Sequence, residues 1–101
     1  MAIYDEACRK AVYKRALNRW GITNQSVVAI EELSECQKEI CKQLRGTGSM
    51  EHMAEEIADS IIMLEQLQMI FNIGNLVAQY MDSKIERLYS RINEDRNGKS
   101  D

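Results

Sequence analysis

The chain contains no proline, and its five glycines stand between long stretches that nothing interrupts. Proline breaks the interior of a helix and glycine weakens it, so this distribution favours helices joined by short turns. Apolar residues recur in these stretches at helical spacing, for example at Tyr4, Cys8, Ala11, Leu17 and Trp20. We therefore predict an all-α fold.

Turn-forming residues divide the chain into four predicted helices. These helices are expected to span residues 4–20, 25–45, 50–71 and 76–92. Gly21 ends the first helix, Thr23 or Asn24 caps the second, and Ser49 caps the third with its side-chain oxygen. The third helix is the most apolar, so we expect it to be buried around much of its circumference. The short links between the helices predict antiparallel neighbours in a four-helix bundle.

The length and charge of the chain limit its class. Its 101 residues suffice for one domain, predicted over residues 1–95, with a polar tail at 96–101 that frays. The formal net charge of -3 argues against a general electrostatic grip on nucleic acid or on an anionic membrane. No apolar run approaches the roughly 20 residues that a membrane span needs.

The three cysteines, Cys8, Cys36 and Cys41, form no CxxC pair, and their number is odd. No apolar leader precedes them, because the start of the chain carries charged residues. We interpret the cysteines as reduced thiols and predict a cytoplasmic protein.

Acidic residues on the predicted second helix fall on an apolar ridge. At about 100° per residue, Glu32 lies on the same side as Val28 and Cys36, which stand one turn before it and one turn after it. Glu35 and Glu39 lie beside this ridge. A solvated acidic face is the ordinary explanation of such a cluster. The position of Glu32 argues instead for a carboxylate that points inward.

The predicted third helix repeats this pattern. Glu56 shares a stripe with Met63 and Leu67, and Asp59 lies one turn along, beside Ile62. Buried carboxylates that lie close together are unfavourable unless protons or cations neutralise them. Ligands that are all oxygen favour Mg²⁺, with Mn²⁺ as a substitute, over Zn²⁺ or copper. The two acidic i,i+3 pairs therefore predict a divalent metal site.

Basic residues on the predicted fourth helix border its apolar side. Lys84, Arg87 and Arg91 occupy the sector that also holds Tyr80 and Leu88. Taken alone, these cations are best explained as rim residues whose stems pack on apolar surface. Beside a carboxylate-bound metal, however, they supply the positive charge that a polyphosphate substrate requires.

Three other chemistries find less support in the sequence. Ferritin-like di-iron sites use Glu-x-x-His pairs, whereas the single histidine, His52, follows Ser49 at that spacing. The sequence GTGS at 46–49 lacks the lysine of a P-loop. Neither Cys36 nor Cys41 has a histidine close to it in the sequence to act as a base.

The acidic pattern resembles that of a known family. The segment Glu31-Glu32-Leu33-Ser34-Glu35, followed by Glu56-Ile57-Ala58-Asp59, resembles the EExxE and ExxD motifs of the MazG-like, all-α nucleoside triphosphate pyrophosphohydrolases. The similarity includes the basic stretch KIERLYSRI and covers about residues 25–92. The same superfamily contains dimeric dUTPases, dCTP pyrophosphatases and phosphoribosyl-ATP pyrophosphohydrolases.

The resemblance implies roles for the acidic residues. The Mg²⁺ ligands would be Glu32, Glu35, Glu56 and Asp59, with Glu31 as an accessory acid of the motif. Glu35 would also accept a proton from the attacking water.

The same resemblance implies which residues hold the substrate. Lys84 and Arg87, with the neighbouring Arg91, would bind the phosphates and stabilise the charge that develops on them. Trp20 and Gln25 lie where the turn between the first two helices approaches the site in relatives, which implies base stacking and contact with the base edge. A core aromatic that closes the bundle is an equally good explanation of Trp20.

The reaction implied is the Mg²⁺-dependent hydrolysis of an NTP or dNTP to the monophosphate and pyrophosphate, as in the removal of unwanted nucleotides from the pool. The family builds its sites across a dimer, and four short helices bury little surface alone, so we expect a homodimer or a dimer of dimers, a homotetramer. Two alternatives stay open. One is a phosphoribosyl-ATP, dUTP or dCTP pyrophosphohydrolase of the same superfamily. The other is a non-catalytic helical module that dimerises and binds a partner through its fourth helix.

Overall fold

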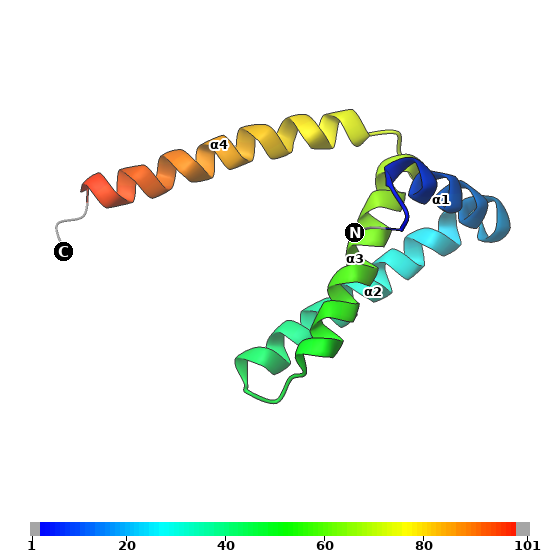
Figure 1. Cartoon of the computed structure of the whole chain (residues 1–101), viewed down its shortest axis with the longest axis horizontal. Helices are drawn as coiled ribbons and strands as arrows, with labels where there is room; N and C mark the ends of the chain where they lie inside the picture. Colours follow the sequence, from blue (N-terminus) through cyan, green and yellow to red (C-terminus); the bar gives the residue numbers. More distant parts are fainter. Residues whose placement is uncertain (1–2, 99–101) are drawn as a thin grey trace. The chain divides into compact units, whose positions relative to one another are not determined.

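The computed structural model describes residues 3–98, and it describes side chains as far as Glu94. Within that range the chain forms four helices and no strand: α1 (Glu6–Trp20), α2 (Ile22–Leu44), α3 (Met50–Ile70) and α4 (Gly74–Gly98). The predicted all-α class is confirmed (Figure 1). None of these helices combines the length and the apolar character that crossing a membrane requires.

Two of the predicted helix ends are confirmed. The start of α1 has a capping residue that was not predicted. Gly21 ends α1, with a φ of 88° that a residue carrying a Cβ rarely adopts. Ser49 caps α3, because its hydroxyl accepts a hydrogen bond from the His52 N–H at 3.3 Å. At the start of α1, the Asp5 carboxylate accepts a bond from the Cys8 N–H at 2.8 Å.

The start of α2 differs from the prediction. The helix begins at Ile22, so Thr23 and Asn24 lie inside its first turn and are not its caps. Gly21 stands directly between α1 and α2, and its carbonyl accepts the Gln25 N–H at 3.1 Å. Since this one residue both ends α1 and precedes α2, no separate capping residue stands between the two helices.

The extent of α4 also differs from the prediction. The helix runs from Gly74 to Gly98, whereas the sequence predicted residues 76–92. Asn72, with a φ of 54°, marks the expected break after α3. No glycine or proline follows Ile92 until Gly98, so nothing in the sequence stops the helix earlier. The tail predicted to fray therefore begins as helix, and residues 99–101 lie outside the described range.

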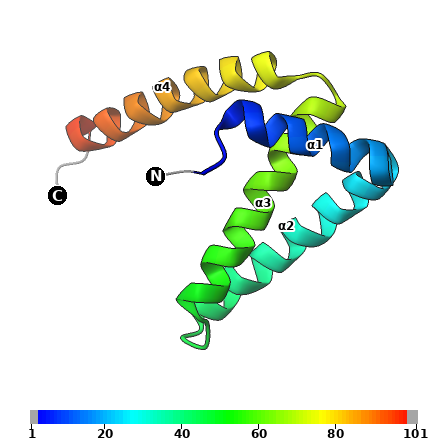
Figure 2. The same ribbon diagram turned by 45° about the vertical axis from the view of Figure 1, so that its right-hand side comes forward.

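The chain divides into two compact units between Phe71 and Asn72. In the first unit, α2 and α3 form an antiparallel pair that closes at the turn over residues 45–49. Helix α1 crosses the open end of this pair (Figure 2). The second unit holds α4.

The interior of the first unit is small and partly polar. Its buried apolar side chains are Tyr13, Ala29 and Met63. Four polar side chains are buried with them: Gln25, Glu39, Ser60 and Gln66. A core with this many polar groups depends on where each hydrogen-bonding atom finds a partner.

The expected burial around most of α3 is not found in the described unit. The buried residues of α3 are Ser60, Met63 and Gln66. On another side of the same helix, Ile57 is 43% exposed and Ile61 is 51% exposed. The main neighbour of α3 is the single helix α2, and one packed helix covers one side of another.

A charged cluster ties α1 to α3. The Tyr13 hydroxyl donates to Oε1 of Glu65, and Nε of Arg9 donates to the same oxygen at 3.0 Å. The bond from Tyr13, and then the bond from Arg9, hold the pKa of Glu65 below its ordinary 4.5, while burial opposes them. Burial, followed by the bond to Glu65, raises the pKa of Tyr13 to about 12.

We predict that Tyr13→Phe destabilises the protein by about 1–2 kcal/mol near neutral pH, because it removes a hydrogen bond to a charged, partly buried carboxylate. Urea unfolding measures the change. Tyr89→Phe is the control, since Tyr89 is exposed on α4. Equal effects of the two substitutions would contradict a role for the Tyr13 hydroxyl.

The same cluster predicts an acid-sensitive contribution to stability. A carboxylate with a lowered pKa in the folded state contributes stability that is present above its unfolded value of 4.5 and is lost as the pH falls through the folded value. Without the Tyr13 hydroxyl, the pKa of Glu65 moves back toward 4.5. The difference in unfolding free energy between wild type and Tyr13→Phe should therefore shrink below pH 4.5.

Candidate metal centre

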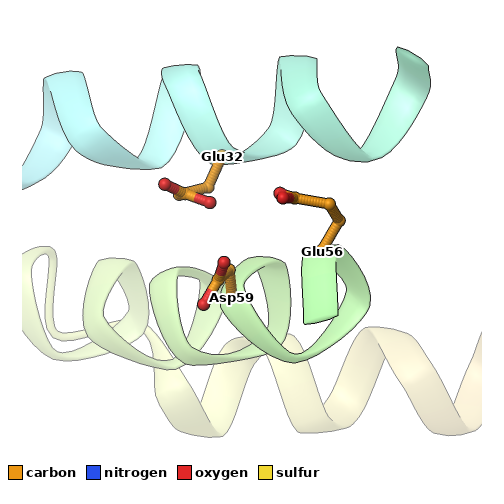
Figure 3. Close-up of side chains that lie close together, drawn as sticks. All are labelled: Glu32, Glu56 and Asp59. Atoms are coloured by element: carbon orange, nitrogen blue, oxygen red, sulfur yellow. The ribbon is translucent and has the colours of Figure 1, made fainter. Parts of the chain in front are cut away.

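Three carboxylates converge where α2 faces α3. Glu32 lies in the middle of α2, and Glu56 and Asp59 lie one turn apart on α3. Each offers an oxygen, and these oxygens all lie within 4.8 Å of one another. Figure 3 shows the three side chains pointing into the same space from the two helices. The two acidic motifs predicted Glu32, Glu35, Glu56 and Asp59 as ligands, and the structure brings three of these four together.

The backbone register between the helices positions the cluster. The Ser60 hydroxyl donates to the backbone carbonyl of Glu32 at 3.4 Å, so this turn of α3 lies level with the middle of α2. Asp59 immediately precedes Ser60, and Glu56 lies one turn before it. The i,i+3 spacing then directs both acids of α3 toward the same part of α2.

The electrostatics of the cluster are unfavourable without a cation. Burial raises the pKa of Glu32 above its ordinary 4.5, and the negative charges of Asp59 and Glu56 raise it further. Glu32 and Glu56 are half-buried, whereas Asp59 is exposed. The arrangement therefore favours either a proton on Glu32 or a positive charge held among the carboxylates.

One oxygen of the cluster has no partner. Oε2 of Glu56 is buried and accepts no hydrogen bond from any described residue. A buried acceptor without a donor is unfavourable, and a carboxylate more so than a neutral group. Mg²⁺ and Mn²⁺ prefer oxygen ligands, carboxylates among them. The donor set and the unpartnered oxygen therefore both fit a divalent cation.

Glu35 is not among the three convergent carboxylates. It is exposed and pairs with Lys38, whose Nζ lies 3.6 Å from Oε1 of Glu35. On α2, residues three apart differ in direction by about 60°, so Glu35 leaves the helix beside Glu32, but its oxygens do not join the cluster. Its neighbour Glu31 is exposed as well. Metal binding by Glu35 stays a prediction.

The residues predicted to contact a base, Trp20 and Gln25, lie at the end of the α2–α3 pair that is opposite the turn over residues 45–49. Gln25 is buried in the first part of α2. Trp20 is 55% exposed and lines a hollow of about 730 Å³ where α1, α2 and the end of α3 meet. The hollow is lined also by Asn24, Met69 and Ile70. Trp20 is thus not enclosed in the interior of the described unit.

The predicted phosphate ligands lie on α4. Lys84, Arg87 and Arg91 are all exposed. None of the three forms an ion pair with another described side chain. Their charge is therefore available to a ligand within the second unit.

Three buried polar residues were given no functional role from the sequence: Glu39, Ser60 and Gln66. Glu39 is buried, and Oε2 of its carboxylate pairs with Nζ of Lys42 at 3.2 Å. Its position two turns after Glu32 on the same stripe was a signal for inward orientation. Gln66 is buried as well, and its Oε1 has no partner among the described residues. An isolated glutamine on an apolar helix gave no comparable signal.

Comparison with known proteins identifies no relative: no family model, no curated protein and no solved structure matches the chain significantly.

We predict that Glu32→Gln stabilises the metal-free protein at pH 7.5 and has little effect near pH 4. The raised pKa of Glu32 means that the folded state holds this proton more tightly than the unfolded chain. The corresponding stability is present below pH 4.5 and is lost as the pH rises through the folded value. Glutamine has a similar shape to protonated glutamate and stays uncharged at every pH. The variant therefore does not lose this stability as the pH rises.

Urea unfolding in EDTA across this pH range measures the effect. Glu31→Gln is the matched control, because Glu31 is an exposed neighbour outside the cluster. If the unfolding free energies of Glu32→Gln and Glu31→Gln depend on pH in the same way, the repulsion that the geometry indicates among the three carboxylates is absent.

Proposed function

We propose that the chain is a MazG-like, Mg²⁺-dependent nucleoside triphosphate pyrophosphohydrolase that converts an NTP or dNTP to the monophosphate and pyrophosphate. The observation that carries this proposal is the convergence of Glu32, Glu56 and Asp59 from two helices, with a buried oxygen of Glu56 left unpartnered. The acids belong to the two motifs in which the sequence resembles that family.

Glu32, Glu56 and Asp59 would hold the metal, since their oxygens already lie close together. Bound Mg²⁺ would supply positive charge that polarises the phosphate oxygens. The three side chains would hold this charge where α2 packs against α3. The phosphate chain of the substrate would therefore lie beside these three carboxylates.

Glu35 is suited to accept a proton from the attacking water. It lies one turn after Glu32 on α2 and is exposed, so water reaches it directly. Both side chains of its ion pair with Lys38 are exposed, and such pairs contribute little to stability. The carboxylate is therefore free to exchange this partner for a water molecule at the edge of the cluster.

Cations on α4 are the phosphate ligands that the family resemblance implies. Lys84, Arg87 and Arg91 are exposed and unpaired among the described side chains, as cations that receive a ligand must be. Arginine binds phosphate through two parallel N–H bonds, and lysine contributes a point charge. Trp20, exposed at its hollow, offers a flat apolar surface for stacking of the base.

Self-association into a homodimer or homotetramer is part of the proposal. Exposed apolar side chains on α2 and α3 include Ile30, Ile40, Ile57 and Ile61. Apolar surface of this extent on paired helices is typical of an interface that another subunit covers.

The decisive experiment measures pyrophosphate release from a panel of NTPs and dNTPs with Mg²⁺, with Mn²⁺ and with EDTA. We expect metal-dependent release with the monophosphate as co-product. Glu56→Gln should reduce kcat/KM by about a hundredfold or more, because it removes a metal ligand with little change of shape. Glu55→Gln, an exposed neighbour, should stay close to wild type.

Silence across the whole panel, from a folded protein that binds no Mn²⁺, would contradict the proposed function. That result would favour the alternative of a helical module that binds a protein partner.

We further predict that Lys84→Ala and Arg87→Ala raise KM for the triphosphate about tenfold each, since each removes positive charge from the phosphates. Steady-state kinetics measure this change. Lys38→Ala is a control for loss of an exposed cation, and it should change KM much less. If all three variants behave alike, α4 does not contribute the phosphate ligands.

A further inference from the structure

A second unpartnered oxygen lies on α3, away from the acidic cluster. Gln66 is only 5% exposed, and its Oε1 accepts no hydrogen bond from any described residue. Its amide nitrogen donates only to Sδ of Met63, at 3.7 Å. A thioether sulfur is a weak acceptor. Both ends of this buried amide are therefore poorly satisfied.

Gln66 is aligned with the acidic cluster. It follows Asp59 by seven residues, which is two helical turns, so both side chains leave α3 on the same stripe. The rise between them is about 10 Å. Because Ser60 lies level with Glu32 and the helices are antiparallel, Gln66 lies level with the buried Gln25 of α2.

The amide also lies one helical turn from a hollow in the surface of the first unit. Met69 and Ile70 stand one turn beyond Gln66, and both line the hollow of about 730 Å³ beside Trp20. Asn24, which precedes Gln25, lines the same hollow. A flat ring bound in this hollow would lie about one turn of α3 from Gln66, and Asp59 of the acidic cluster lies two turns farther along the same helix.

We propose that Gln66 determines base specificity by reading the hydrogen-bonding edge of the substrate's nucleobase. Its amide oxygen accepts a hydrogen bond from an N–H of the base, and its amide nitrogen donates to a neighbouring acceptor on the base. This inference rests on the proposed function, because it places the phosphates of the same nucleotide at Glu32, Glu56 and Asp59. A buried amide that gains its partner only from the substrate discriminates strongly against a base that lacks the N–H.

The first test needs no variant. The preferred nucleotide is compared with the same nucleotide methylated on the N–H at its hydrogen-bonding edge. Wild type should turn over the methylated form at least about tenfold less efficiently, measured as kcat/KM. Equal efficiency for the two nucleotides would overturn the role of Gln66 as a reader of that edge.

The second test uses Gln66→Met, which keeps an unbranched side chain of similar length and removes the amide. We expect kcat/KM for the preferred nucleotide to fall at least tenfold and the preference over the methylated form to disappear. Mn²⁺ affinity, measured separately, should stay unchanged because the cluster is intact. Gln68→Met, at a half-buried neighbouring position, is the matched control.

The outcomes separate this inference from the proposed function. If wild type hydrolyses nucleotides but Gln66→Met keeps the base preference, Gln66 is a structural residue and this inference fails alone. If wild type binds Mn²⁺ yet neither binds nor hydrolyses any nucleotide, both fail together. If Gln66→Met does not fold, the inference is judged by the first test. Equal kcat/KM of wild type for the methylated and the unmethylated nucleotide then overturns it.

Discussion

The packing of α2 against α3 places carboxylates from two helices in one space, and the proposed chemistry depends on this contact. The hydrogen bond from Ser60 to the Glu32 carbonyl marks the register. In that register Glu32 meets Glu56 and Asp59, and the pKa of Glu32 rises through burial and repulsion. The helix pair thus includes an interaction that opposes its own stability unless a cation or a proton is present.

The two buried oxygens of α3 that accept no hydrogen bond are suited to different kinds of ligand. Oε2 of Glu56 belongs to a carboxyl group and fits a metal ion, whereas Oε1 of Gln66 belongs to an amide and fits an N–H donor. They lie on the side of α3 that is buried, with the turn of Met63 between them. A nucleotide whose phosphates accompany a metal provides both partners, one at each end. This correspondence links the proposed reaction to the proposed base preference.

Many apolar side chains of the helices are not buried in the described interior. α3 packs against one main neighbour, and Ile57 and Ile61 on another side stay exposed. On α4, side chains such as Ile85 and Leu88 are exposed as well. Helices of this length gain most of their stability from packing an apolar face, and these uncovered faces are the basis of the proposed self-association.

The amino-acid sequence by itself determined the helical class, the turn at Gly21 and the cap at Ser49, because these depend on φ preferences and on hydrogen bonds within a few residues. It also placed Glu32 and Glu56 on the apolar side of their helices, where both are half-buried, since helical periodicity fixes direction. Only the tertiary structure decided that Glu35 stays outside the cluster and that Gln66 is buried without a partner for its oxygen. Those outcomes depend on which side of each helix a neighbour covers, and periodicity along one helix does not contain that information.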